Sequence, residues 1–239
     1  MKPPSRNSLL TILLCSFALM PFASAQTVDV SAHVRVTKAR GASRASHQSS
    51  ADVVVWLTPK GNPPIPRVQQ NYTLIQKDKQ FIPHILVVRT GSSVDFPNLD
   101  PFYHNVFSLF NGKRFDLGLY EAHTHRAVLF DRDGVSYIFC NIHPDMGAVV
   151  VSLSTPYFGI STRDGDIKIP NVPAGNYRLN IWAENVAVDH LNALSREVDV
   201  SSSSADLGTF DLQASGDIMT HHQNKFGENY TPVPEDKYQ

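Results

Sequence analysis

The sequence predicts an all-β protein built as a β-sandwich. Its apolar runs are short, rich in β-branched and aromatic residues, and partly alternate with polar residues. The 16 Pro and 13 Gly residues are spread through all 239 positions, so the runs are bounded by residues that favour turns. A chain of this length suffices for one large domain or two small ones with their own cores.

Residues 1–25 predict a cleaved export signal. Lys2 and Arg6 form its basic start, residues 9–20 are a short apolar run, and the small residues at 23–25 provide a cleavage site. The run is too short for a bilayer span of about 20 residues. Nothing else in the sequence is apolar enough to cross a membrane. We therefore expect a periplasmic or secreted protein.

Charge argues against one class of partner. Without the export signal the chain holds 19 basic and 22 acidic residues, and Lys and Arg form no stripe. Nucleic-acid binding is therefore not expected.

The first half of the exported chain predicts short strands. Residues 28–36 alternate imperfectly, and residues 52–57 are β-branched and aromatic. Residues 39–50 are small and polar and predict a loop, whereas the prolines within 61–66 cannot continue a ladder. Further strands are expected at 72–76, 85–89, 93–96 and 106–110.

The second half continues this pattern. Turn signals stand at 131–134 and 164–165. Residues 189–195 predict one helical turn, and the polar chain from 214 to 239 predicts a flexible tail. Strands are expected at 126–130, 136–140, 148–153, 158–161, 166–169, 176–182, 197–200 and 207–212.

Cys140 is the only cysteine outside the export signal, which contains Cys15. A single thiol in an exported protein has no internal disulfide partner. It opens the run Cys140-Asn141-Ile142-His143-Pro144-Asp145-Met146, in which an imidazole and a thioether follow at three-residue spacing. Thiolate, imidazole and thioether are ligands of mononuclear blue-copper sites, which require one further imidazole.

His104 can supply that imidazole. It precedes an expected strand, whereas Cys140 ends another, so the two side chains can meet at neighbouring strand ends. Two imidazoles and a thiolate form a trigonal copper site, with Met146 as a long axial ligand. The thiolate must be deprotonated, so copper binding should weaken in acid. The main-chain N–H of Asn105 is a candidate hydrogen-bond donor to the sulfur.

Residues 80–109 and 128–153 resemble the cupredoxin family, and most of all the amicyanin and plastocyanin-like type 1 copper proteins. The resemblance implies a Greek-key β-sandwich that holds one copper ion, Cu(I) or Cu(II). It also implies an apolar patch around His143 as the electron port. Residues 111–125 are longer and more charged than the resemblance implies. The matching residues are Phe81-Ile82-Pro83, Gly91, Asn98, His104-Asn105-Val106, the strand before Cys140, His143-Pro144, Met146 and 149–151. By this resemblance His104, Cys140 and His143 are the strong ligands, Met146 is axial, and Asn98, Asn105 and Pro144 support them.

A second part resembles the carboxypeptidase regulatory-like modules, which are smaller prealbumin-like β-sandwiches. The resemblance rests on strands at 28–36 and 51–57, the turn at 162–165 and the run at 172–177. It implies a discontinuous domain, 26–58 and 155–213, with a cupredoxin domain of residues 59–154 inserted. The alternative is two consecutive domains that meet near residue 155.

Five further histidines have simpler interpretations than metal binding. His84 is expected to be a packed or capped side chain, and His123 and His125 to be solvated on one face of a strand. His221 and His222 belong to the predicted tail. A second metal site at any of them stays open.

Three classes of function remain. The first is a periplasmic type 1 copper protein that carries single electrons between redox proteins. The alternatives are a periplasmic copper storage or delivery protein, or a cell-surface interaction β-sandwich with a secondary metal site. An enzyme is not expected, because no nucleophile–base pair is recognisable and a lone type 1 centre leaves no open position for substrate.

Overall fold

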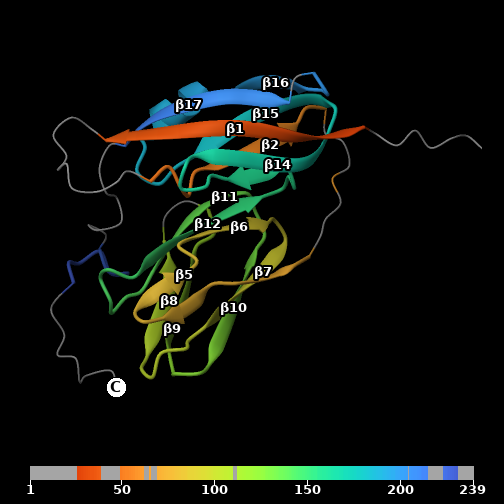
Figure 1. Cartoon of the computed structure of the whole chain (residues 1–239). Helices are drawn as coiled ribbons and strands as arrows, with labels where there is room; N and C mark the ends of the chain where they lie inside the picture. Colours follow the sequence, from red (N-terminus) through yellow and green to blue (C-terminus); the bar gives the residue numbers. More distant parts are fainter. Residues whose placement is uncertain are drawn as a thin grey trace, which may run out of the picture.

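The computed structural model describes residues 26–38, 49–61, 65, 69–109, 112–203, 205–214 and 223–230. The regular structure consists of strands β1 to β17 and one short helix, α1 (Val188–Leu194). The prediction of an all-β protein is therefore confirmed. Two groups of sheets lie one above the other in Figure 1. The predicted export signal lies outside the described residues. Within the described part, no helix is long and apolar enough to cross a bilayer.

The upper group of sheets, which we call the flanking sandwich, contains the first and last strands of the chain. One sheet has the order β14-β1-β17, and the other has the order β13-β2-β15-β16. Strands β1 and β2 therefore pair with strands beyond residue 155, as an inserted central unit requires. The domain boundaries themselves remain a prediction. The strands are β1 (Thr27–Lys38), β2 (Val54–Pro59), β13 (Phe158–Ile160), β14 (Asp166–Pro173), β15 (Gly175–Trp182), β16 (Arg196–Val200) and β17 (Asp206–Ala214).

The lower group, which we call the central sandwich, is formed by the strands between β2 and β13. Its larger sheet has the order β6-β12-β11-β8-β9 and its smaller sheet the order β10-β7-β3, with the pair β4-β5 beside them. The parallel pair of β6 and β12 joins strands that are distant in sequence. The strands are β3 (Asn71–Thr73), β4 (Ile75–Lys77), β5 (Gln80–Ile82), β6 (Ile85–Arg89), β7 (Ser92–Pro97), β8 (His104–Ser108), β9 (Phe115–Tyr120), β10 (His125–Phe130), β11 (Gly134–Phe139) and β12 (Gly147–Leu153).

Strand β12 takes part in both hydrophobic cores. Ala148 and Val150 belong to the cluster inside the central sandwich, whereas Val149 and Val151 belong to the cluster of the flanking sandwich. Successive side chains of a strand point to opposite faces, so a run of buried Val residues indicates a sheet covered on both sides. The flanking sandwich therefore covers the outer face of the larger central sheet.

Two segments differ from the sequence-based expectation. The expected strand 72–76 is divided at Leu74, where the chain leaves the pairing with β7 and begins the pairing with β5. The segment 111–125, for which the sequence indicated only greater length and charge than the resemblance implies, contains β9 as an edge strand beside β8. The pairing of β9 is irregular, and Gly118 within it adopts a left-handed φ of 67°. Beyond this irregularity Leu119 is exposed and Tyr120 is buried, so burial along β9 does not keep a period of two.

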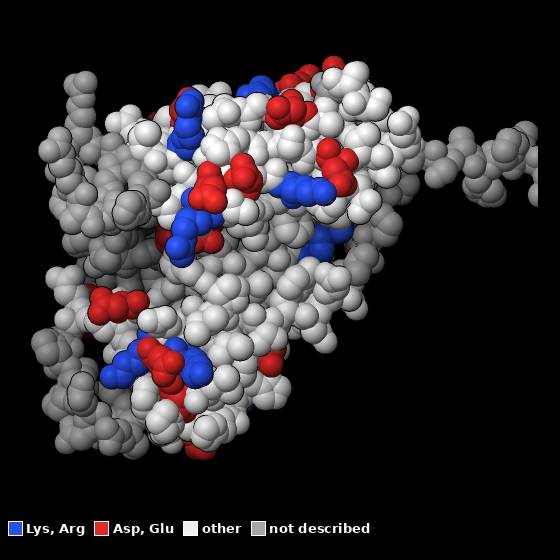
Figure 2. Space-filling model, in the orientation of Figure 1, with Lys and Arg blue, Asp and Glu red and all other residues white. Residues whose placement is uncertain are grey.

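Charged side chains are mixed over the visible surface. On the face drawn in Figure 2, acidic and basic residues lie beside one another and form no patch of one sign. This distribution agrees with the near balance of 21 Lys and Arg against 22 Asp and Glu residues in the whole chain.

Candidate metal centre

His104 and Cys140 meet at one end of the larger central sheet. His104 opens β8, and Cys140 directly follows β11, which is the antiparallel neighbour of β8. In an antiparallel pair, the start of one strand lies beside the end of the other. His143 and Met146 return from the loop between β11 and β12, so residues 140–146, which we call the ligand loop, close over this end of the sheet.

Three of the four predicted ligands have their donor atoms close together. The donor atoms of His104, Cys140 and His143 lie within 4.8 Å of one another, and they form the one such group among the described residues. The Cys140 Sγ lies 3.5 Å from His143 Nδ1 and 3.9 Å from His104 Nδ1. The two Nδ1 atoms are 3.1 Å apart. Cys140 and His104 are fully buried, whereas His143 is half-buried.

Asp100 determines which nitrogen of His104 faces the site. Its Oδ2 lies 2.7 Å from His104 Nε2, so Nε2 carries the hydrogen and Nδ1 presents a lone pair toward Cys140. The carboxylate also accepts the main-chain N–H groups of Asp78 and Lys79. Burial opposes the ionisation of Asp100, but these three partners outweigh burial and lower its pKa. Sequence reasoning missed Asp100, although an acid four residues before a ligand histidine was a usable signal.

Burial has the largest effect on the pKa of the Cys140 thiol. It raises the pKa of the thiol, while the main-chain N–H groups of Asn105, Ile142 and His143 oppose that shift by hydrogen bonds to the sulfur. The N–H donor expected at Asn105 is thus present. A cation bound beside the sulfur would stabilise the thiolate against the effect of burial.

Both imidazoles are kept neutral. Burial lowers the pKa of His104, although Asp100 opposes the shift. Burial, His104 and Lys79 lower the pKa of His143 to about 4. The Phe102 ring packs edge-on against both imidazoles, with centroid distances of 5.2 and 5.7 Å. Neutral imidazole is the form that binds metal.

Met146 is held in the ligand loop by its main chain. Its N–H donates to His143 O at 3.1 Å, and its carbonyl accepts the Cys140 N–H at 3.1 Å. The side chain is buried in the same apolar cluster as Cys140. These contacts hold the main chain of Met146 beside Cys140 and His143 but assign its thioether no role at the site.

The three supporting residues occupy different positions. The Asn98 side chain accepts the Asp100 N–H at 3.0 Å and donates to Phe102 O at 2.7 Å, so it shapes the loop before His104. The Asn105 side chain donates to Asp116 Oδ1 at 2.8 Å. Pro144 is exposed within the ligand loop.

The segment 223–230 also reaches the ligand loop. The Tyr230 hydroxyl donates to Cys140 O at 2.7 Å, and the Lys225 N–H donates to Asn141 Oδ1 at 2.9 Å. The prediction of a flexible tail did not include these contacts. The residues between β17 and this segment, including His221 and His222, lie outside the described residues.

Of the histidines considered for a second metal site, His84 and His125 have acidic partners and His123 lies in a turn. His84 Nε2 lies 2.8 Å from Glu184 Oε2, and His125 Nδ1 lies 2.7 Å from Asp95 Oδ1. The expectation that His123 and His125 share a strand face is wrong. His123 lies in the preceding turn with a φ of 59°, and His125 is the first residue of β10.

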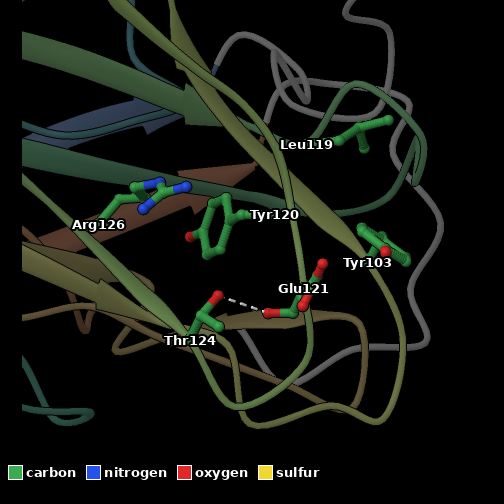
Figure 3. Close-up of a pocket in the computed structure, with 6 residues that line it drawn as sticks. All are labelled: Tyr103, Leu119, Tyr120, Glu121, Thr124 and Arg126. Carbon is green, nitrogen blue, oxygen red and sulfur yellow. Dashed lines mark hydrogen bonds between the residues drawn. The ribbon is translucent and has the colours of Figure 1, made fainter.

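A shallow pocket of about 290 Å³ lies beside this end of the fold (Figure 3). The Thr124 hydroxyl donates to Glu121 O at 2.7 Å across its floor. The Arg126 guanidinium lies 5.9 Å from the centroid of the Tyr120 ring. The pocket is lined by Tyr103, Leu119, Tyr120, Glu121, Thr124 and Arg126.

Comparison with known proteins gives one family model and several remote structures. Residues 144–206 match the model of polysaccharide lyase family 4, domain II. A purple cupredoxin from Nitrosopumilus maritimus is 21% identical, with a TM-score of 0.32, and the match covers 34% of this chain and 99% of that chain. An amicyanin mutant in its reduced state is 18% identical, with a TM-score of 0.33 and coverage of 41% of this chain and 99% of that chain.

The copper-containing nitrite reductase NirK from Thermus scotoductus SA-01 is 17% identical, with a TM-score of 0.34. That match covers 50% of this chain but only 28% of the reductase. No curated protein matches. Similarities at this level do not place the chain in a family, so any functional conclusion must come from the site.

Proposed function

We propose that this protein is an exported copper-binding protein that carries single electrons between redox proteins. The main support for this proposal is that the donor atoms of Cys140, His104 and His143 lie within 4.8 Å of one another. One thiolate, two imidazoles and a nearby thioether form the donor set of a type 1 copper site. When bound, copper supplies a one-electron couple.

The protonation of the site supports this proposal. Asp100 leaves the lone pair of His104 Nδ1 directed inward, and burial keeps both imidazoles neutral. Burial raises the pKa of the Cys140 thiol, so a cation that stabilises the thiolate removes the largest unfavourable electrostatic contribution. The donors thus fit a thiophilic metal ion.

The scaffold suits electron transfer. The ligands stand at the ends of paired strands and in a short loop closed by the Cys140–Met146 hydrogen bond. Such a loop reorganises little when the charge of the site changes. His143 is the half-buried ligand, whereas His104 and Cys140 are fully buried. We therefore assign His143 as the exit for the electron, and Met146 would be the fourth residue to hold the metal.

The remaining parts of the proposal concern the whole chain. We infer that residues 1–25 direct export and are removed. The cupredoxin unit, residues 59–154, is inserted in a carboxypeptidase regulatory-like sandwich, residues 26–58 and 155–213. The partners are redox proteins that dock near His143, and the protein is not itself an enzyme.

The test is copper loading of the purified protein. Stoichiometric Cu(II) uptake with an intense thiolate-to-copper band that bleaches and recovers in a reduction cycle is expected. Colourless binding of Cu(I) alone would instead support storage or delivery. If neither ion binds with one-to-one stoichiometry, the proposed copper site is wrong and the interaction sandwich becomes the better description. A matched sample of Cys140→Ser controls for adventitious surface binding.

A further inference from the structure

We propose that residues 223–230 form a strap that positions the ligand loop, with Tyr230 as a positioning residue for Cys140. The inference rests on the proposed copper site. The strap follows β17 in the chain and docks on the central sandwich (Figure 1, blue segment near the C-terminus).

Tyr230 completes the hydrogen bonding of the Cys140 peptide. Cys140 lies just beyond β11, where the strand ladder has ended. Its N–H donates to Met146 O at 3.1 Å, and its carbonyl accepts the Tyr230 hydroxyl at 2.7 Å. A buried main-chain carbonyl without a partner is costly, so this hydroxyl fixes the orientation of the peptide group attached to the ligand cysteine.

Lys225 connects the strap to the ligand loop and to β9. Its N–H donates to Asn141 Oδ1 at 2.9 Å, beside Cys140, and its Nζ lies 2.7 Å from Asp116 Oδ2. The Asp116 carboxylate also accepts the side-chain N–H of Asn105 at 2.8 Å. The Asn105 main-chain N–H in turn bonds to the Cys140 sulfur. Lys225 therefore contacts Asn141, the residue after Cys140, and it reaches Asn105 through Asp116.

The Asp116 contact is charged. Burial opposes the ionisation of Asp116, but hydrogen bonds from Lys225, Gly118 and Asn105 outweigh burial and lower its pKa. The Lys225 and Asp116 side chains are 24% and 36% exposed, so solvent screens this ion pair only in part.

The strap has its own turn. Asn224 Oδ1 accepts the N–H groups of Phe226 and Glu228 at 2.9 and 3.0 Å, and the Gly227 N–H donates to Asn224 O at 3.0 Å. Gly227 adopts a left-handed φ of 77°, which a glycine accepts without strain. A segment that is already folded loses less conformational entropy when it docks.

The first experiment measures amide hydrogen exchange in the copper-free protein. Tyr230→Phe, Lys225→Met and truncation after residue 222 are compared with two matched controls, Tyr157→Phe and Lys60→Met. Tyr157 packs in the flanking core, and Lys60 forms a surface ion pair with Glu197. Exchange at Ile142 and His143 should accelerate about 5- to 10-fold in each strap variant, as expected for the loss of one hydrogen bond. Unchanged exchange in all three strap variants, or equal acceleration in the controls, overturns the strap.

The second experiment measures the reduction potential and the visible spectrum of the copper site, which a loss of overall stability alone would not change. In the copper-loaded protein, Tyr230→Phe should shift both the reduction potential and the wavelength of the thiolate-to-copper band relative to Tyr157→Phe. Lys225→Arg should retain the native spectrum, because it keeps the charge opposite Asp116, whereas Lys225→Met should not. Identical spectra and potentials in all of these proteins contradict the positioning role. Failure of the unmodified chain to bind copper would instead defeat the proposed function, and the exchange experiment would still decide the strap.

Discussion

The carboxylate of Asp100 lies 2.7 Å from Nε2 of His104, on the side of the imidazole opposite Cys140. Both side chains are almost completely buried, with exposures of 5% and 0%. The pair directs the lone pair of His104 toward the thiol, as a carboxylate does for many metal-binding histidines. The orientation of one proposed ligand therefore depends on a residue that does not touch the metal position.

Asp100→Asn tests this dependence. The neutral amide is a weaker acceptor and can rotate to present its NH₂ group, so His104 loses its fixed tautomer. We expect copper affinity to fall about 10- to 100-fold, measured by competition with a chelator of known affinity. Asp95→Asn is the matched control, because Asp95 holds the exposed His125 at the same distance of 2.7 Å. Equal loss in both variants would contradict a specific role for Asp100.

Cys140→Ser and Met146→Leu separate the roles of the two proposed sulfur ligands. A serine hydroxyl does not ionise near neutral pH, so the intense visible band should disappear completely. Leucine conserves the volume of the buried methionine, and the free energy of unfolding should change by less than about 1.5 kcal/mol. We expect Met146→Leu to keep a blue colour and to shift the reduction potential. Colour in Cys140→Ser, or none in Met146→Leu, would show that the ligand assignment is wrong.

Copper uptake should depend on pH in two steps. Burial raises the pKa of the Cys140 thiol, so binding displaces one proton over the neutral and mildly acidic range. Affinity should then fall about tenfold for each unit of decreasing pH, since one proton competes with the metal. In stronger acid the two imidazoles also take up protons, His143 with a pKa of about 4 and His104 with a lowered pKa, so the slope should steepen. Stopped-flow or chelator titrations from pH 8 to pH 3.5 measure the slope. A flat profile between pH 8 and pH 5 would show that the thiol is not a ligand.

The sequence contained most of the information about the strands. Ile85–Arg89 has the bounds expected from its apolar run, and the other major strands differ at their ends by a few residues. Runs of Val with turn residues on both sides are strong local signals, and they remain valid in the folded protein. Strand β9 was missed although Phe115, Leu117 and Leu119 alternate with Asp116 and Gly118, because a charged segment that contains a glycine is also typical of a loop.

Residues around the site were harder to predict than the ligands. His104, Cys140 and His143 have rare donor atoms at recognisable spacing, so their convergence could be anticipated. Asp116 and Tyr230 have no such signature. Asp116 lies near the site because β9 pairs with β8. Tyr230 lies there because a segment 90 residues after Cys140 in the sequence contacts it in the fold. Only the tertiary structure brings such pairs together.

His84 and Glu184 link the two sandwiches in a pH-dependent manner. His84 Nδ1 faces Gly147 O at 3.2 Å and Nε2 faces Glu184 Oε2 at 2.8 Å, so both nitrogens meet acceptors and the imidazolium is favoured. Glu184 raises the pKa of His84 above 6.5, although burial opposes the shift. A raised folded-state pKa stabilises the fold below the unfolded pKa, and this contribution is lost as pH rises through the folded pKa.

Glu184→Gln should remove this pH dependence. The His84 side chain is 44% exposed, so solvent screening limits the effect to about 1 kcal/mol or less in the free energy of unfolding. Urea unfolding at pH 5.5 and pH 8.5 should show a larger difference between the two pH values in the unmodified protein than in the variant. Asp166→Asn, which breaks the exposed pair with His33, provides the control. Equal pH dependence in the unmodified protein and Glu184→Gln would rule out the pair as its source.

The shared strand β12 should make the two sandwiches unfold together. Val150 packs in the central core and Val151 in the flanking core, and both are fully buried. Val150→Ala and Val151→Ala should each lower the free energy of unfolding by about 1 to 3 kcal/mol, because each leaves a small cavity. Since neighbouring residues of one strand serve both cores, loss of either core removes a face from the other. Fluorescence of Trp56 and Trp182, which both pack in the flanking core, and the thiol reactivity of buried Cys140 in the central core should therefore follow one transition in both variants. A variant in which the Cys140 thiol becomes reactive at a lower urea concentration than the tryptophan transition would show that the sandwiches unfold independently.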